Sequence, residues 1–166
     1  IELSGEAATA QDYFQLGRYY YFGGVNAEID TISMSKADAK NKAFDLYKKA
    51  ISTYGIVQER VPESHLGVYQ QAWTSYRMYP NSEQGLAKPY YEKTTEVILA
   101  KPEQDDNDKK VLAEAYSYLS YYYYLQYDKS KKADDKLKVK EYAEKVLKVD
   151  PENANGKSLF EFASAK

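Results

Sequence analysis

Side chains able to perform acid–base or metal chemistry are few in this sequence of 166 residues. His65 is the only histidine, so neither a histidine-based catalytic triad nor a two-histidine metal site can be built. The absence of cysteine excludes disulfides, thiolate metal sites and a cysteine nucleophile. Because His65 follows Pro62-Glu63-Ser64 at an expected helix start, we expect it to be solvated or to cap that helix.

An acidic run, Asp105-Asp106-Asn107-Asp108, has the composition of a calcium loop. It lacks the glycine and the distal glutamate of such a loop, and acidic residues are also favoured before a helix. We therefore expect Asp106 or Asn107 to cap a helix. The lysines of segment 129–140 alternate with aspartates and form a solvated face. With no carboxylate pair singled out for catalysis, the sequence predicts a protein that is not an enzyme and holds no cofactor or metal.

Composition restricts the partners further. A net charge of -2 provides no field for nucleic acid, and no apolar stretch approaches the roughly 20 residues needed to cross a bilayer. Nineteen tyrosines are the strongest anomaly, and tyrosine serves both as a core aromatic and as an interface residue, so both roles stay open. Because the chain starts at Ile1, we expect a processed or trimmed part of a longer protein. Its composition leans towards a bacterial periplasmic or exported protein, with the cytoplasm left open.

The elements that must position these residues are helices. One pattern occurs three times: Tyr13, Leu16-Gly17 and Tyr20; Tyr69, Ala72-Trp73 and Tyr76; Tyr116, Leu119-Ser120 and Tyr123. Each copy precedes a segment with small residues on one stripe, and these offsets place each set on one helix face. The first such stripe holds Ala39, Ala43, Leu46, Tyr47, Ala50 and Tyr54. We expect helices over 10–22, 35–55, 62–78, 85–100, 109–127 and 137–149, and a short one after Pro151. Gly23-Gly24 and Gly55 would end the first two, and Pro62 and Pro89 would lie in first turns.

The three copies resemble the tetratricopeptide repeat, whose signature is an aromatic, a Leu-Gly pair, a Tyr, and then Ala, an aromatic, Ala and Pro. The resemblance implies an all-α, right-handed α-α superhelix of about three helix pairs, over 10–56, 62–100 and 107–151, with a capping helix at 152–163. One domain would span 1–166. The family's packing roles fall on Gly17, Trp73 and Ser120, with Ala43, Ala87 and Val139 opposite them. The copies stand further apart than the family's 34-residue period, which predicts long helices or inserted loops.

The resemblance also implies a concave groove, lined by the first helix of each pair, that binds a peptide or a partner's helix. No Lys or Asn occupies the mapped positions, so the family's chaperone-tail clamp is not expected. Two alternatives stay open: a small-ligand or glycan-binding helical domain, and a structural spacer. The predicted partner-binding residues are Gln11, Phe14, Arg18, Tyr21, Gln70, Thr74, Arg77, Ser117, Tyr121 and Tyr124.

Overall fold

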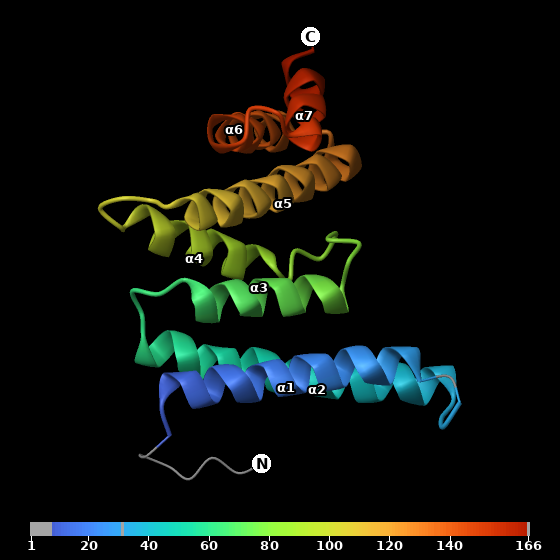
Figure 1. Cartoon of the computed structure of the whole chain (residues 1–166). Coiled ribbons are helices and arrows are strands. Elements are labelled where there is room, and N and C mark those ends of the chain that lie inside the picture. The colour runs from blue at the N-terminus through green and yellow to red at the C-terminus, as the bar shows by residue number, and fades with distance from the viewer. Residues whose placement is uncertain (1–7, 31, 166) are drawn as a thin grey trace. The chain divides into compact units, whose positions relative to one another are not determined.

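The computed structural model describes residues 8–30 and 32–165, and every element in these ranges is helical. The all-α prediction is confirmed (Figure 1). The chain divides into two compact units, Ile1–Pro80 and Asn81–Lys166, which are described separately. The helices are α1 (Ala10–Ile29), α2 (Lys36–Arg60) and α3 (Leu66–Met78) in unit 1, and α4 (Lys88–Leu99), α5 (Asp106–Ser130), α6 (Ala133–Val149) and α7 (Ala154–Ser164) in unit 2.

In unit 1, α1 packs against α2, and α2 packs against α3. Thr9 opens α1 with a capping box: its side chain accepts the N–H of Asp12, whose carboxylate accepts the N–H of Thr9 in return. Ser35 caps α2 as expected, accepting the N–H of Asp38 at 3.1 Å. The first two helices therefore begin where their polar residues predict.

The expected ends of α1 and α2 are wrong. The first helix continues through Gly23-Gly24 to Ile29, and the second continues past Gly55 to Arg60. Gly24 serves close packing instead, because a Cβ there would lie 2.5 Å from Cε1 of Tyr47. Gly17 stands in the same relation to Tyr54, also at 2.5 Å. Close approach at Gly17 is thus confirmed, although the atoms nearest to it belong to Tyr54 rather than to the expected Ala43.

The core of unit 1 is built on the α2 stripe that the sequence predicts. Its members are fully buried and are joined by Tyr21 and Ala27 of α1 and by Met78 of α3. A fully buried aromatic side chain contributes one of the larger hydrophobic terms available to a small unit. The stripe residues of this core are Ala43, Tyr47, Ala50 and Tyr54, whereas Leu46 of the predicted stripe is only half-buried.

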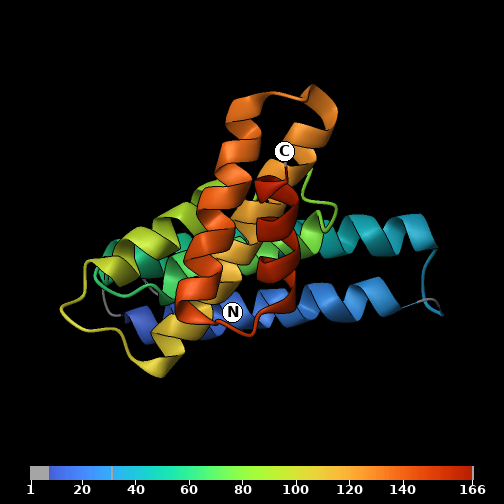
Figure 2. The same cartoon turned by 90° about the horizontal axis from the view of Figure 1, so that it is seen from above.

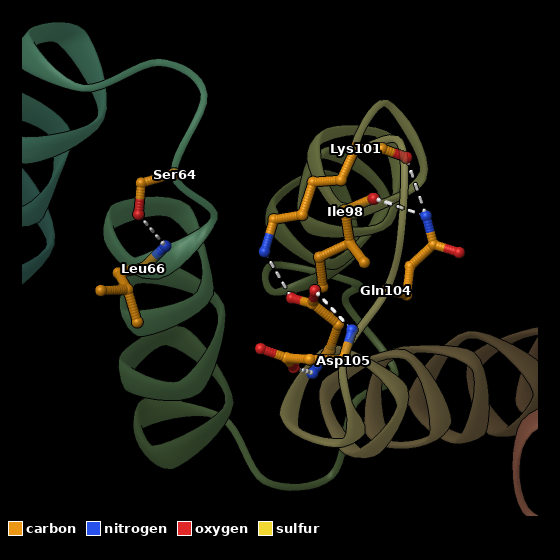
Figure 3. A network of polar contacts seen from close by, with 7 residues as sticks. Ser64, Leu66, Ile98, Lys101, Gln104 and Asp105 are labelled. Carbon is orange, nitrogen blue, oxygen red and sulfur yellow. Dashed lines mark hydrogen bonds and ion pairs between the residues drawn. The ribbon is translucent and has the colours of Figure 1, made fainter.

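The start of α3 differs from expectation. Pro62 precedes the helix rather than lying in its first turn, and the N–H of Leu66 is accepted by Ser64 Oγ at 3.3 Å (Figure 3). His65 is buried, with 5% of its surface exposed, and its ring contacts Tyr69 edge-on, so the solvated role is wrong. It does occupy the N-cap position of α3, but its side chain makes no capping hydrogen bond. The physical reason lies in the close packing of this turn on α2, where a Cβ on Gly67 would lie 2.7 Å from the backbone nitrogen of Gln58.

In unit 2, the acidic run begins α5 as predicted, but Asp105 is the cap rather than Asp106 or Asn107. Asp105 accepts the N–H of Asp108 at 2.7 Å, and the Asp108 carboxylate accepts the N–H of Asp105. Lys101 pairs with buried Asp108 at 2.6 Å, and Gln104 donates to the carbonyl of Lys101 at 3.0 Å (Figure 3). The carboxylates of this run therefore organise a helix start.

The start of α4 also differs: Gly85 forms a turn with a φ of +65°, and the helix begins at Lys88. Glycine suits that left-handed conformation, and a Cβ there would also lie 2.6 Å from the Tyr122 ring.

In the same unit, α5 packs against α4 and α6, and α7 packs against α6 and α5. The predicted approach of Ser120 and Val139 is confirmed, because buried Ser120 Oγ donates to the Val139 carbonyl at 3.0 Å. Figure 2 shows α6 and α7 side by side. The ring of Phe162 in α7 meets the ring of Tyr124 in α5 edge-on, with centroids 4.9 Å apart. The seventh helix therefore covers part of α5, as the expected capping helix would.

The helix pairs α1–α2 and α5–α6 pack as the repeat requires. The second predicted pair, α3 and α4, has one helix in each unit. One domain over 1–166 stays a prediction.

Candidate partner-binding site

The predicted groove positions of α1 differ in exposure. Gln11 and Arg18 are exposed, whereas Phe14 is half-buried and lies 5.8 Å from the ring of Tyr54. Tyr21 is 8% exposed and belongs to the core of unit 1. The α1 stripe therefore offers polar groups at its edge, while its aromatic rings are packed inwards.

On α3, the predicted residues have three different surroundings. Thr74 is fully buried and its hydroxyl donates to the Gln70 carbonyl at 2.7 Å, so it offers no surface to a partner. Gln70 is half-buried. Arg77 is exposed and lies at the C-terminal end of the helix.

The predicted residues of α5 lie in unit 2. Tyr121 is 45% exposed, whereas Ser117 and Tyr124 are half-buried. The rings of Tyr121 and Tyr124 stack with centroids 6.1 Å apart and an interplanar angle of 20°. Because Phe162 covers an edge of Tyr124, Tyr121 is the most accessible of the three.

Two of the predicted residues, Tyr21 and Arg77, come together in unit 1. They line a hollow of about 430 Å³, which we call the unit-1 hollow, and four further residues complete its wall. Its size lies within the range of small-ligand and side-chain sites. The additional lining residues are Glu28, Trp73, Tyr76 and Pro80.

The sequence analysis missed Glu28 because it ended α1 at Gly23-Gly24. In the structure, the last two turns of α1 carry this carboxylate towards α3. Both Nε and Nη2 of Arg77 donate to Oε2 of Glu28, at 3.1 and 2.6 Å. These hydrogen bonds raise the pKa of the Arg77 guanidinium, which therefore keeps its charge beside Glu28.

Trp73 was expected to pack where α3 approaches its partner helix, and this expectation is wrong. Its ring is 42% exposed and stacks on Tyr21 of α1, with centroids 5.8 Å apart and an interplanar angle of 30°. Tyr76 is also exposed on the same helix. An indole is too large for the close approach that Gly17 allows in the first pair, and here it forms the wall of the unit-1 hollow instead.

The hydroxyl of Tyr47 is fully buried and lies close to the ion pair. Within the described residues it makes no hydrogen bond of good geometry, but the side chains of Arg77 and Glu28 are near enough to interact with it. Burial is the main cause that raises the pKa of Tyr47 to about 12. Tyr47 is therefore neutral at physiological pH, and the Arg77–Glu28 pair supplies the charges of this region.

Within residues 8–30 and 32–165, no cluster of acidic or histidine side chains has the arrangement of a metal site. In the same part of the chain, none of the helices combines the length and apolarity that crossing a bilayer requires.

The antiparallel helix pairs α1–α2 and α5–α6, with large aromatics on their first members, are those of a tetratricopeptide-like helical repeat. The structure resembles the crystal structure of the C-terminal part of a TPR repeat-containing protein from Cytophaga hutchinsonii, with a TM-score of 0.59 and 27% sequence identity. The match covers 90% of this chain and 59% of the other, so this chain spans less than two thirds of that structure. No protein-family model and no curated protein matches. Folds of this class are generally protein-interaction modules and are usually non-catalytic.

Proposed function

We propose that this protein is a non-enzymatic interaction module that binds a peptide or a partner's helix through the predicted residues, which lie on α1 and α3 in unit 1 and on α5 in unit 2. The observation that carries the proposal is the unit-1 hollow, where Trp73, Tyr76 and Arg77 are accessible beside Tyr21. Aromatic and arginine side chains in a concavity are the features most enriched at binding hot spots. Thr74 is removed from the binding set because it is buried.

Each remaining residue would make a distinct contribution. Arg18 presents a planar guanidinium group that can donate to carboxylates or backbone carbonyls, whereas Arg77, already paired with Glu28, can donate to a backbone carbonyl. Tyr121 provides an exposed ring whose immobilisation costs little side-chain entropy. Gln11 and Gln70 can hydrogen-bond to an extended backbone, while Phe14, Ser117 and Tyr124 would provide apolar support at the edge of the bound segment.

The test compares three baits in affinity capture from cells of the source organism, followed by titration calorimetry with the purified partner. The Arg18→Ala/Arg77→Ala/Tyr121→Ala variant should lose the partner that the parent retains. The control, Tyr19→Ala/Lys48→Ala/Lys93→Ala, removes one ring and two cations from other exposed positions and should bind as the parent does. Equal affinity of the parent and the first variant for the purified partner would refute the proposed surface.

A small-ligand or glycan-binding function is the second candidate, favoured by one observation: the unit-1 hollow has the size and aromatic walls of a sugar-stacking pocket. A saccharide that raises the melting temperature of the parent but not of Trp73→Ala would favour it. If neither proteins nor saccharides bind, a spacer role in which the tyrosines serve only the core is the remaining function.

A further inference from the structure

We propose that the unit-1 hollow is an anchor site for one uncharged aromatic side chain of the bound peptide. This inference rests on the proposed function and names the chemistry that the partner must present. Three properties of the hollow carry it: the shape of its walls, the neutrality of its polar end, and the hydrogen-bonding atoms left beside it.

The hollow is lined by one buried aromatic ring and by two exposed ones. Tyr21 is buried and forms the floor together with Trp73, which stacks on it and keeps 42% of its surface exposed. Tyr76, 40% exposed, and Pro80 complete the apolar lining. Because aromatic pairs prefer offset-stacked or edge-to-face arrangements, a further ring can extend the Tyr21–Trp73 stack or meet the edge of Tyr76. The volume of about 430 Å³ is large enough to admit a ring with the backbone beside it.

The polar end of the hollow is self-neutralised, which disfavours a charged occupant. A carboxylate that took Arg77 would leave Glu28, whose side chain is only 25% exposed, without its partner. A lysine or arginine could in principle stack on Trp73. It would meet Arg77 first, however, since the Arg77 side chain is 44% exposed and is the more accessible charge of the pair. A neutral ring incurs neither cost.

The ion pair also leaves atoms with which a peptide backbone can bond. Both of its hydrogen bonds end on Oε2 of Glu28, and they come from Nε and Nη2 of Arg77. Neither uses Oε1 of Glu28 or Nη1 of Arg77. Next to an anchored ring, Oε1 can accept a peptide N–H and Nη1 can donate to a peptide carbonyl, which would orient the segment while its side chain fills the hollow.

The chain contains a reporter for this site, because Trp73 is its only tryptophan. We would titrate the full chain with N-acetyl-phenylalanine amide and follow Trp73 emission, with the corresponding lysine, glutamate and glycine amides as matched probes. The phenylalanine amide should give a saturable change at tens of millimolar, which the other three do not. Tyr76→Ala keeps the reporter and should abolish the change, whereas Tyr19→Ala, altered at an exposed tyrosine outside the hollow, should keep it.

A second arm uses a displayed library of random peptides selected on the parent protein. The selected peptides should share one aromatic position, and Trp73→Ala should weaken them about tenfold or more, as expected for a hot-spot residue. Trp73→Phe, which keeps a ring, should stay within a few-fold of the parent. Circular dichroism melts establish whether each variant is folded. If Trp73→Ala or Tyr76→Ala unfolds, the parent, Trp73→Phe and Tyr19→Ala proteins still test whether binding requires an aromatic position in the peptide.

The outcomes separate this inference from the proposed function. Selected peptides without a shared aromatic, or with affinities that Trp73→Ala leaves unchanged, would overturn the anchor while the interaction module stands. A stronger response to the lysine or glutamate amide would overturn the neutral occupant. If no peptide binds, the proposed function fails, and a phenylalanine amide signal in that case would mark a small-molecule pocket instead of a peptide anchor.

Discussion

Gly24 of α1 lies directly against the ring of Tyr47 in α2: a Cβ on the glycine would be 2.5 Å from Cε1 of the tyrosine. Gly17 and Tyr54 repeat this contact two helical turns away, so two glycines of one helix receive two tyrosines of the other. Since atoms cannot approach so closely, each tyrosine can be fully buried only because its opposing residue has no side chain. This contact sets the spacing of α1 and α2, and through α1 it sets the position of Glu28 at the unit-1 hollow.

Replacing Gly24 by alanine should destabilise the protein, because the new methyl group overpacks against Tyr47. We expect a loss of about 1–3 kcal/mol in the free energy of unfolding, measured by urea denaturation. Gly23→Ala is the matched control: a Cβ there would lie 3.5 Å from Leu46, an ordinary contact. It should gain roughly 0.5–1 kcal/mol, because alanine is the better residue within a helix. Equal effects of the two substitutions would show that the Gly24–Tyr47 contact does not limit packing.

The capping box at Asp105 should contribute measurably to α5. Asp105→Ala removes the acceptor for the Asp108 N–H and should cost about 0.5–2 kcal/mol of stability, measured by thermal or urea unfolding. Asp106→Ala changes the adjacent exposed carboxylate, paired only with Lys109 at the surface, and should stay within about 0.5 kcal/mol.

The same acidic run should show no response to calcium. Its carboxylates begin a helix, and Asp108 is already paired with Lys101. Millimolar calcium chloride should therefore leave the melting temperature unchanged relative to magnesium chloride. A specific increase with calcium, lost in Asp105→Ala, would restore the metal-site interpretation.

The free energy of unfolding should fall at alkaline pH, because buried tyrosines such as Tyr47 then lose their phenolic protons. The folded state raises the pKa of Tyr47 to about 12 from its ordinary value of 10.0, mainly by burial, so folding holds the phenolic proton more tightly than the unfolded chain does. The stabilisation is complete below pH 10 and is lost as the pH rises from about 10 to about 12. We expect melting temperatures to drop across this window, measured by circular dichroism.

Tyr47→Phe should weaken that alkaline drop while changing stability little at pH 7, because the hydroxyl it removes makes no hydrogen bond of good geometry within the described residues, although it lies close to Arg77 and Glu28. Tyr19→Phe, at an exposed position, is the control and should leave the pH profile as in the parent. A Tyr47→Phe profile that matches the parent would assign the alkaline transition to other groups.

The Arg77–Glu28 pair should couple α3 to the C-terminal turns of α1. In a double-mutant cycle with Arg77→Met and Glu28→Gln, we expect an interaction energy of about 0.5–1 kcal/mol, because the pair is partly exposed. Molar salt should reduce it, since screening acts on accessible charges. A coupling near zero at low salt would mean that the pair adds no stability, and it would weaken the case for a pre-formed polar end in the hollow.

Much of the local architecture could be predicted from the sequence because the signals act over a few residues. Ser35 caps α2, the acidic run begins α5, and the Ala43-Tyr47-Ala50-Tyr54 stripe is buried, each as the helical spacing indicates. Capping residues and helical periodicity depend on neighbours one to two turns away, and these are visible in the chain itself. The all-α class follows from the same signals, whereas the repeat class was implied by the resemblance of the three aromatic copies to the tetratricopeptide repeat.

Other features depend on contacts between helices and could not be predicted in this way. Gly23-Gly24 has the composition of a helix end, and only the ring of Tyr47 on α2 shows why α1 continues through it. Thr74 and Trp73 are adjacent in the sequence, yet one is buried and the other forms a wall of the hollow. Their exposure depends on which helix faces each side of α3, and periodicity within a single helix does not contain that information. The Arg77–Glu28 pair joins residues far apart in the chain, so tertiary packing alone determined where the hollow's charges meet.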